Sequence, residues 1–182
     1  AYLSNFAPYI PTLAAIKVMP GVYDIKSLYA RVRGVFTHTV PVDAYRGAGR
    51  PESIYMIERL MDKAAQELGV DRIQLRRKNF ISSKIMPFTT TADEIYDSGD
   101  FDRVINMVTA RANWQTFGDR RTEAKNLGRR RGIGLCYYIE STMGDPGEAA
   151  EVRFEPDGTV SILVGTQSNG QGHETIYAQI LA

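Results

Sequence analysis

Two glycine-rich segments hold the residues of this sequence whose types and spacing could do chemistry. The first segment, 43–52, places Gly47 and Gly49 between Arg46 and Arg50, directly before an apolar stripe at helical spacing. Glycines let a backbone approach a ligand closely, and N–H groups at a helix start bind anions. A simple strand-to-helix connection explains the same residues, and the pattern alone supports both interpretations equally.

The second segment, 165–175, also leaves an alternating stretch and enters a helix-forming run. It contains Asn169 and Gln171, and no charged residue precedes His173. No lysine follows its last glycine, and the dinucleotide-binding spacing G-x-G-x-x-G is absent, so neither phosphate-binding motif applies. His173 has no second histidine one turn on, which excludes a zinc helix. Neutral donors around glycines suit a large polar ligand better than acid–base catalysis.

Composition narrows the class of protein. Hydrophobic residues make up 43% of the 182 residues and charged residues 24%, as in ordinary globular proteins. The net charge of +1 gives no overall field for nucleic acid or an anionic membrane. The run Arg129–Arg131 is the local exception, for which we favour a solvated helix end or a loop beside a strand over a nucleic-acid surface.

The single cysteine, Cys136, cannot form an internal disulfide, and its apolar neighbours predict a small buried side chain. A reducing, cytoplasmic compartment fits. We find no signal peptide and no membrane span, and we expect that the chain was cut from something longer, because neither end carries a natural start or stop signal.

The elements that must position the two segments follow from periodicity. Residues 51–68 predict a helix that ends at Gly69, Asp71 and Asp100 predict N-caps of further helices, and a polar helix is expected to stop at Gly128. Alternation predicts a strand over 28–40 and the two arms of a hairpin around Pro156–Gly158, and the apolar run 133–139 predicts a buried strand. The fold class is therefore α+β, with mixed helices and antiparallel strands. We divide the chain into 1–128, with the first loop, and 129–182, with the hairpin and the second loop.

The segment 44–52 resembles the active-site loop of the molybdenum hydroxylases, the xanthine dehydrogenase and aldehyde oxidase family, and 165–175 resembles the second cofactor loop of that family. Three further stretches, 2–6, 75–80 and 96–100, match the same subunit in order, so the resemblance spans nearly the whole chain. Bacterial aldehyde and carbon monoxide dehydrogenase large subunits are the nearest in pattern. The resemblance implies that this chain is a fragment of such a larger multi-domain subunit.

The resemblance implies a molybdenum–molybdopterin cofactor, in the cytosine dinucleotide form usual in bacteria, and oxidation of aldehydes or related small substrates with water as the oxygen source. It places Arg46 and Gly47 beside the molybdenum ligands and Gln171 near the metal centre. Ala48 and the backbone of Gly170, Gly172 and His173 would complete the cofactor wall. FAD and 2Fe-2S clusters would lie on partner subunits, a medium FAD-binding and a small iron–sulfur one. We also expect a homo-oligomer, because an excised piece would expose apolar faces.

Two departures bear on the substrate. Where carbon monoxide dehydrogenases carry a copper-binding cysteine, this sequence has Gly47, and where purine oxidisers carry a stacking phenylalanine it has Ala48. The catalytic glutamate of the family lies in a C-terminal segment that this sequence does not contain, so no residue here is assigned as catalytic. Glu140, Glu148 and Glu174 lie outside that motif, and we do not assign any of them as the catalytic base. The alternatives are a carbon monoxide dehydrogenase without the copper-binding cysteine and a non-catalytic binding or assembly domain.

Overall fold

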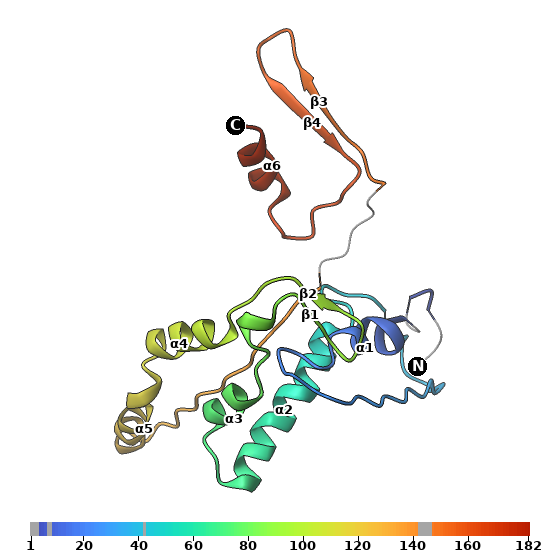
Figure 1. Ribbon diagram of the computed structural model, residues 1–182. Coiled ribbons are helices and arrows are strands. Elements are labelled where there is room, and N and C mark those ends of the chain that lie inside the picture. The colour runs from blue at the N-terminus through green and yellow to red at the C-terminus, as the bar shows by residue number, and fades with distance from the viewer. Residues whose placement is uncertain (1–3, 7–8, 42, 142–146) are drawn as a thin grey trace. The chain divides into compact units, whose positions relative to one another are not determined.

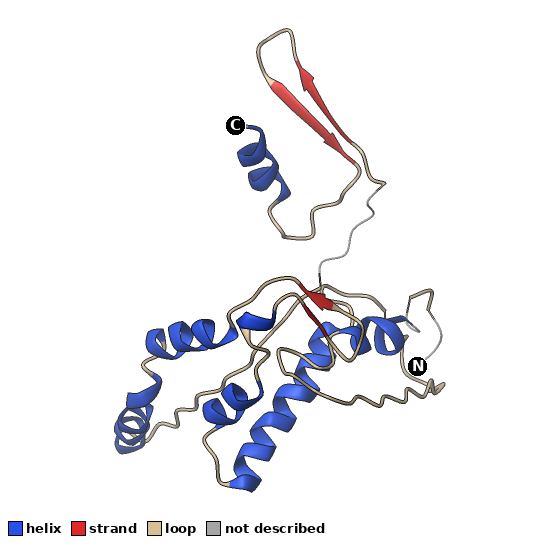
Figure 2. Ribbon diagram, viewed as in Figure 1, coloured by secondary structure: helices blue, strands red, loops and turns tan. Residues whose placement is uncertain are grey.

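The computed structural model describes residues 4–6, 9–41, 43–141 and 147–182. Helices and short antiparallel strands make up its regular structure, which confirms the α+β class (Figures 1 and 2). The elements in chain order are the π-helical turn η1 (Ile10–Ala14), α1 (Ala15–Lys17), α2 (Arg50–Leu68), α3 (Arg72–Asn79), the 3-10 turn η2 (Ser83–Ile85), β1 (Phe88–Thr89), β2 (Ile95–Tyr96), α4 (Phe101–Arg111), the 3-10 turn η3 (Trp114–Thr116), α5 (Phe117–Asn126), β3 (Ala150–Phe154), β4 (Val160–Val164) and α6 (His173–Leu181). The chain forms two compact units, Ala1–Ser141 and Thr142–Ala182, hereafter the N-terminal and C-terminal units. The sequence-based division at residue 128 follows the order of motifs and stays a prediction.

Helix ends follow the predicted capping residues. Asp71 Oδ1 accepts hydrogen bonds from the N–H groups of Ile73 and Gln74 at the start of α3, and Asp100 caps α4 by accepting from Arg103 N. Gly69 ends α2 in the left-handed conformation, φ 64°. These short-range rules place the helices correctly because each rests on a contact within one turn.

A buried ion pair between α2 and α3 organises the N-terminal unit. Glu58 Oε2 accepts from Arg76 Nε at 3.0 Å and Nη2 at 2.8 Å, and from the backbone N–H of Tyr137 at 2.9 Å. Arg76 Nη1 also donates to Asp62 Oδ1 at 2.9 Å, and the Tyr23 hydroxyl donates to Glu58 Oε1. Arg76 is fully buried. Burial alone would lower its pKa, but the Glu58 carboxylate raises it above the ordinary value.

An aromatic cluster lies beside this ion pair. The Tyr23 and Phe80 rings stack with centroids 5.9 Å apart, and Tyr137 meets Phe80 edge-on at 5.3 Å and Phe101 at 5.7 Å. Burial, and then the hydrogen bond to Glu58, raise the pKa of Tyr23 far above its usual range. The N-terminal unit thus combines an apolar core with the buried Glu58–Arg76 ion pair.

The hairpin is the best-predicted feature of the C-terminal unit. β3 and β4 pair antiparallel, with Ala150 opposite Val164 and Phe154 opposite Val160. Gly158 lies in the turn at φ 85°, and Asp157 Oδ1 accepts from Thr159 N and Oγ1. These two bonds lower the pKa of Asp157.

Two of the predicted strands are wrong. Residues 28–40 and 133–139 are in no strand of the described chain. From 133 to 139 the odd positions are half-buried and the even ones exposed, so the strand periodicity is present without a partner for a ladder. The same alternation turns Cys136 outward, and the prediction that this side chain is buried is therefore also wrong.

Candidate cofactor-binding loops

The first loop enters α2 through three consecutive residues of positive φ: Gly47 at 88°, Ala48 at 31° and Gly49 at 91°. Ala48 N donates to the Tyr45 carbonyl at 2.8 Å, and Arg50 N donates to the Gly47 carbonyl at 3.0 Å. Gly49 is the N-cap of α2, and no side chain caps the helix there. Among the described residues, nothing accepts the N–H groups of Gly47, Gly49 and Glu52.

Packing fixes the glycines of this loop. A Cβ at Gly49 would lie 2.5 Å from the Ile10 carbonyl oxygen and 2.7 Å from Ala15 N. A Cβ at Gly47 would lie 2.9 Å from Pro51 Cδ and 3.2 Å from the Tyr138 hydroxyl. Close approach to the protein itself therefore demands both glycines, independently of any ligand.

Arg50 holds the loop from inside and was not among the predicted site residues. Its side chain is 5% exposed, Nη1 donates to the carbonyls of Gly47 at 3.3 Å and Ala48 at 3.2 Å, and Nη2 donates to the Ser141 carbonyl at 3.4 Å. Its Nε lies 3.2 Å from Glu140 Oε1. The sequence signal for this role was the position of Arg50 at the first turn of a helix behind two glycines.

Arg46, in contrast, is exposed. Within the described parts of the chain, no hydrogen bond or ion pair engages its guanidinium group. The structure therefore divides the two arginines of the loop, with Arg50 structural and Arg46 available.

The Tyr138 hydroxyl lies beside the first loop, close to Gly47. This hydroxyl donates to Glu140 Oε2 at 3.0 Å. Partial burial, and then the hydrogen bond to the Glu140 carboxylate, raise the pKa of Tyr138 to about 12. Glu140 thus has partners in both Arg50 and Tyr138 and ties the two side chains together beside the loop.

The second loop enters α6 with the same backbone device. Gly170 has φ 102° and Gly172 has φ 78°, and Gly172 is an N-cap without a side-chain hydrogen bond. The Gly172 carbonyl accepts from Thr175 N at 3.1 Å and Ile176 N at 3.0 Å. In the described chain, nothing accepts the N–H groups of Gly172 and His173, and a Cβ at Gly172 would meet nothing within 4 Å.

Gln171 and His173 are partly engaged by their own unit. Gln171 Oε1 accepts from Asn169 N, and its Nε2 donates to the Gln167 carbonyl at 3.4 Å. The His173 ring stacks on Tyr177 at 4.9 Å, and its buried Nδ1 has no partner among the residues that the structure describes.

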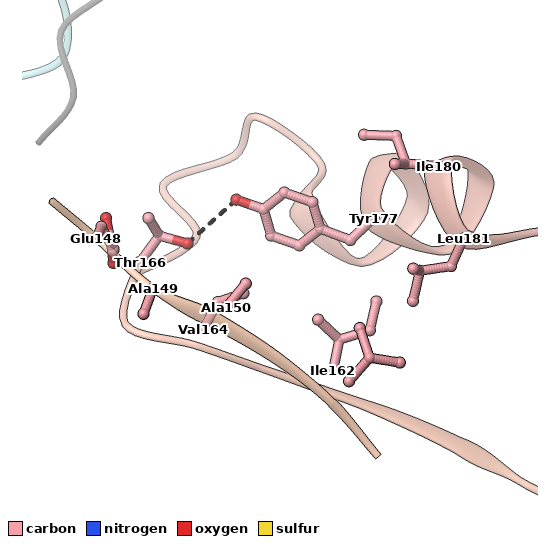
Figure 3. A pocket seen from close by; sticks show the side chains of 10 residues that line it. Glu148, Ala149, Ala150, Ile162, Val164, Thr166, Tyr177, Ile180 and Leu181 are labelled. Carbon is pink, nitrogen blue, oxygen red and sulfur yellow. Dashed lines mark hydrogen bonds between the residues drawn. The ribbon is translucent and has the colours of Figure 1, made fainter. Parts of the chain in front are cut away.

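A cavity of about 310 Å³ lies between the hairpin and α6 within the C-terminal unit (Figure 3). Its walls are mainly apolar, and at one end the Thr166 and Tyr177 hydroxyls are 3.2 Å apart. Glu148 lies at the same end, with Oε1 2.7 Å from the point where a Cβ on Gly165 would stand. The cavity is a gap between an open sheet face and a helix, with one carboxylate at its rim.

The predicted site residues form two groups. Arg46, Gly47 and Ala48 are contiguous in the N-terminal unit, and 170–173 are contiguous in the C-terminal unit. The described residues hold no cluster of three metal-ligating side chains. No described helix is long and apolar enough to cross a membrane.

Comparison with known proteins supplies the family. Two models, each described as a molybdopterin cofactor-binding domain, match residues 1–80 and 107–182. The chain is 34% identical over 181 residues to the carbon monoxide dehydrogenase large chain of Hydrogenophaga pseudoflava, covering 91% of this chain and 22% of that protein. It is 31% identical to the gamma subunit of the 6-hydroxypseudooxynicotine dehydrogenase complex of Paenarthrobacter nicotinovorans. That match covers 100% of this chain and 23% of that protein. The crystal structure of quinoline 2-oxidoreductase from Pseudomonas putida 86 matches with a TM-score of 0.82 and 30% identity over 94% of this chain and 23% of that one.

The chain belongs to the molybdenum hydroxylase family, within its molybdopterin-binding subunits. It spans less than a quarter of the length of these relatives. The resemblance carried by the two loops is thereby confirmed at the level of the family, whereas the role of each loop residue remains a prediction.

The loops of this molybdopterin-binding chain fit a polar, anionic group. Each presents unpaired backbone N–H groups at the start of a helix, and Gly172 is open to close approach. Arg46 adds one free positive charge beside the first loop. The donors are neutral amides and one guanidinium, a set that binds phosphates and carbonyl or oxo oxygens rather than a bare cation.

Proposed function

We propose that this chain is part of the molybdopterin-binding catalytic subunit of a molybdenum hydroxylase that oxidises aldehydes or related small substrates with water as the oxygen source. The observation that carries the proposal is the shared geometry of Gly49 and Gly172. Both are left-handed N-caps without a side-chain hydrogen bond, and both leave backbone donors unpaired at a helix start. The family match supports the cofactor to which these donors are assigned.

The residues divide the work of holding the cofactor. The N–H groups of Gly170, Gly172 and His173 would bind its phosphate and carbonyl oxygens. Arg46 and Gln171 would hydrogen-bond to oxygen atoms near the metal centre and keep them polarised, and the backbone of Gly47 would lie beside them. When bound, the cofactor supplies the redox-active metal centre at which the substrate carbon is hydroxylated.

Gly47 and Ala48 favour a small substrate. Gly47 has no thiol for a copper ion, and Ala48 has no ring on which a flat purine could stack. The structure tolerates no thiol-bearing Cβ at Gly47 without displacing Pro51 or Tyr138. A second candidate is a carbon monoxide dehydrogenase that lacks the copper-binding cysteine, which the 34% identity to the Hydrogenophaga large chain favours.

A third candidate is a non-catalytic binding or assembly module. It is favoured by Gln171, whose two polar atoms already bond within its own loop. For the complete enzyme we further propose the cytosine dinucleotide form of the cofactor, a cytoplasmic location, and assembly into a homo-oligomer with an FAD-binding medium and an iron–sulfur small subunit. We assign the catalytic base to a part of the enzyme outside these 182 residues.

Arg46→Ala is the sharpest test, because its guanidinium group makes no contact whose loss could damage the fold. In the complete enzyme purified with its subunits, we expect this variant to lose most of its substrate-dependent dye reduction. Gln171→Ala should lower both activity and the molybdenum and pterin content, measured by elemental analysis and by fluorescence of the released pterin. The matched control is Arg33→Ala, an exposed arginine outside both loops.

The outcomes separate the candidates. If neither loop variant changes metal content or activity, the loops are only turns and the module interpretation holds. Aldehyde-dependent activity without carbon monoxide-dependent activity supports the first candidate, and the reverse supports the second. Enzyme without molybdenum and pterin would refute both.

A further inference from the structure

A basic cluster at the end of α5 is unexplained by the cofactor loops. Residues 117–131 hold six basic and two acidic side chains, in a chain whose whole net charge is only +1. Arg129, Arg130 and Arg131 are exposed, and none of them pairs with a carboxylate in the described chain. Elsewhere in the N-terminal unit, Arg50 and Arg76 each lie against one.

The turn that ends α5 sets the direction in which the chain carrying the three arginines continues. Gly128, at φ 68°, donates to the Lys125 carbonyl at 3.0 Å, and Arg129 N donates to the Ala124 carbonyl at 2.8 Å. These two bonds form a Schellman motif, which reverses the chain at a helix end. The arginine run therefore folds back beside α5 and borders a cavity of about 340 Å³ together with Glu123 and Leu127.

The side chains around this cluster argue against nucleic acid and lipid as its binding partner. Trp114 already carries the Arg72 guanidinium over its ring at 5.9 Å, and Phe117 carries that of Arg120 at 5.6 Å, so the nearby aromatic rings are partly occupied and poorly suited to stacking on bases. Apart from Phe117 at its start and Ala124, the side chains of α5 are polar or charged, so the helix has no apolar stripe with which to lie in a lipid surface.

Two features favour a protein partner. Leu127 is 66% exposed at the edge of the cavity, and Glu123 interrupts the positive charge that a continuous phosphate backbone would need. Guanidinium groups bind carboxylates in pairs of parallel hydrogen bonds.

We propose that Arg129–Arg131, with Leu127, form a docking surface for an acidic segment of another protein that carries both carboxylate and apolar side chains. The arginines take the carboxylates, and Leu127 takes an apolar side chain between them. The Gly128 turn fixes the direction in which the backbone carrying the three arginines leaves α5. This surface is independent of the cofactor loops, and the proposal does not require that they bind molybdopterin.

The test measures binding of the complete subunit that contains this chain to a short synthetic peptide of glutamate and leucine. Two other anionic ligands are compared with the peptide at the same concentration of negative charge: a single-stranded RNA oligonucleotide, and vesicles of phosphatidylserine with phosphatidylcholine. We expect the peptide to bind most tightly, and R129Q/R130Q/R131Q to weaken it by at least about tenfold. The matched control R31Q/R33Q/R59Q removes the same charge from exposed positions and should change binding by less than about twofold.

Gly128→Ala keeps every charge and strains only the turn, so we expect it to weaken binding by about threefold. Circular dichroism checks that each variant is folded. Equal losses in the cluster and control variants, unchanged binding in Gly128→Ala, absence of peptide binding, or tighter binding of RNA or vesicles would each overturn the proposal.

Discussion

The N-terminal and C-terminal units differ most in what their apolar residues contact. The first has a buried set that includes Ile54, Ile81 and Ile105, each 1% exposed. No described residue of the second, 147–182, is buried, and Phe154 and Ile180 are 83% and 74% exposed. The N-terminal unit therefore has a hydrophobic core of its own, whereas the apolar side chains of the C-terminal unit stay partly or fully exposed.

This difference shows that the C-terminal unit lacks apolar contacts on one face of its hairpin. A two-stranded hairpin is only marginally stable by itself. β3 and β4 keep their register through a well-formed turn, but the cavity beneath them separates their apolar face from α6. We infer that the C-terminal unit depends on additional apolar surface, from the N-terminal unit, from a longer chain or from a second copy, and the expected self-association would meet that need.

Removing the Glu58 charge should give the largest effect. Glu58→Gln leaves the fully buried Arg76 without its main counter-charge, and we expect the free energy of unfolding of the N-terminal unit to fall by about 3 to 5 kcal/mol. Urea unfolding followed by the fluorescence of Trp114, the single tryptophan, measures this directly.

Glu67→Gln on the same helix is the control, because Glu67 is exposed and should change stability by less than about 0.5 kcal/mol. If Glu58→Gln behaved like this control, the ion pair would not organise the unit, and the contrast between the two units would be weaker than their burial indicates.

The sequence predicted what is local. The caps of α3 and α4, the end of α2 at Gly69 and the hairpin around Gly158 all depend on residues within a few positions of one another. The predicted strands over 28–40 and 133–139 are wrong because a strand requires a partner, and neither alternation nor an apolar run says whether that partner lies within these residues.

The candidate site shows the same limit. Glycine spacing identified both loops, since positive φ at a helix start is a local requirement. The contact of Arg50 with the Ser141 carbonyl joins residues 91 positions apart, and no short-range pattern could reveal that contact. The same holds for Tyr137 N, whose acceptor is Glu58.

A methyl group at Gly49 should have the next largest effect. Gly49→Ala combines a left-handed backbone with a Cβ 2.5 Å from the Ile10 carbonyl oxygen, and we expect a loss of about 2 to 4 kcal/mol. Gly69→Ala shares the positive φ but meets nothing within 4 Å, so it should lose only about 1 kcal/mol. Equal losses in urea unfolding would mean that the loop shifts away from η1 at little cost, and that packing does not fix its entry into α2.

The smallest expected effect comes from the same substitution, isoleucine to valine, made once in each unit. Ile54→Val removes one buried methylene from α2 and should lower the free energy of unfolding by about 1 kcal/mol. Ile162→Val makes the same change at a β4 residue that lines the open cavity, where it removes little buried contact and should cost less than about 0.3 kcal/mol. Hydrogen exchange of the β3 and β4 amides follows the second variant, and Trp114 fluorescence the first. A loss at Ile162 as large as that at Ile54 would show that the hairpin has a closed core in solution, and the contrast between the two units would then not hold.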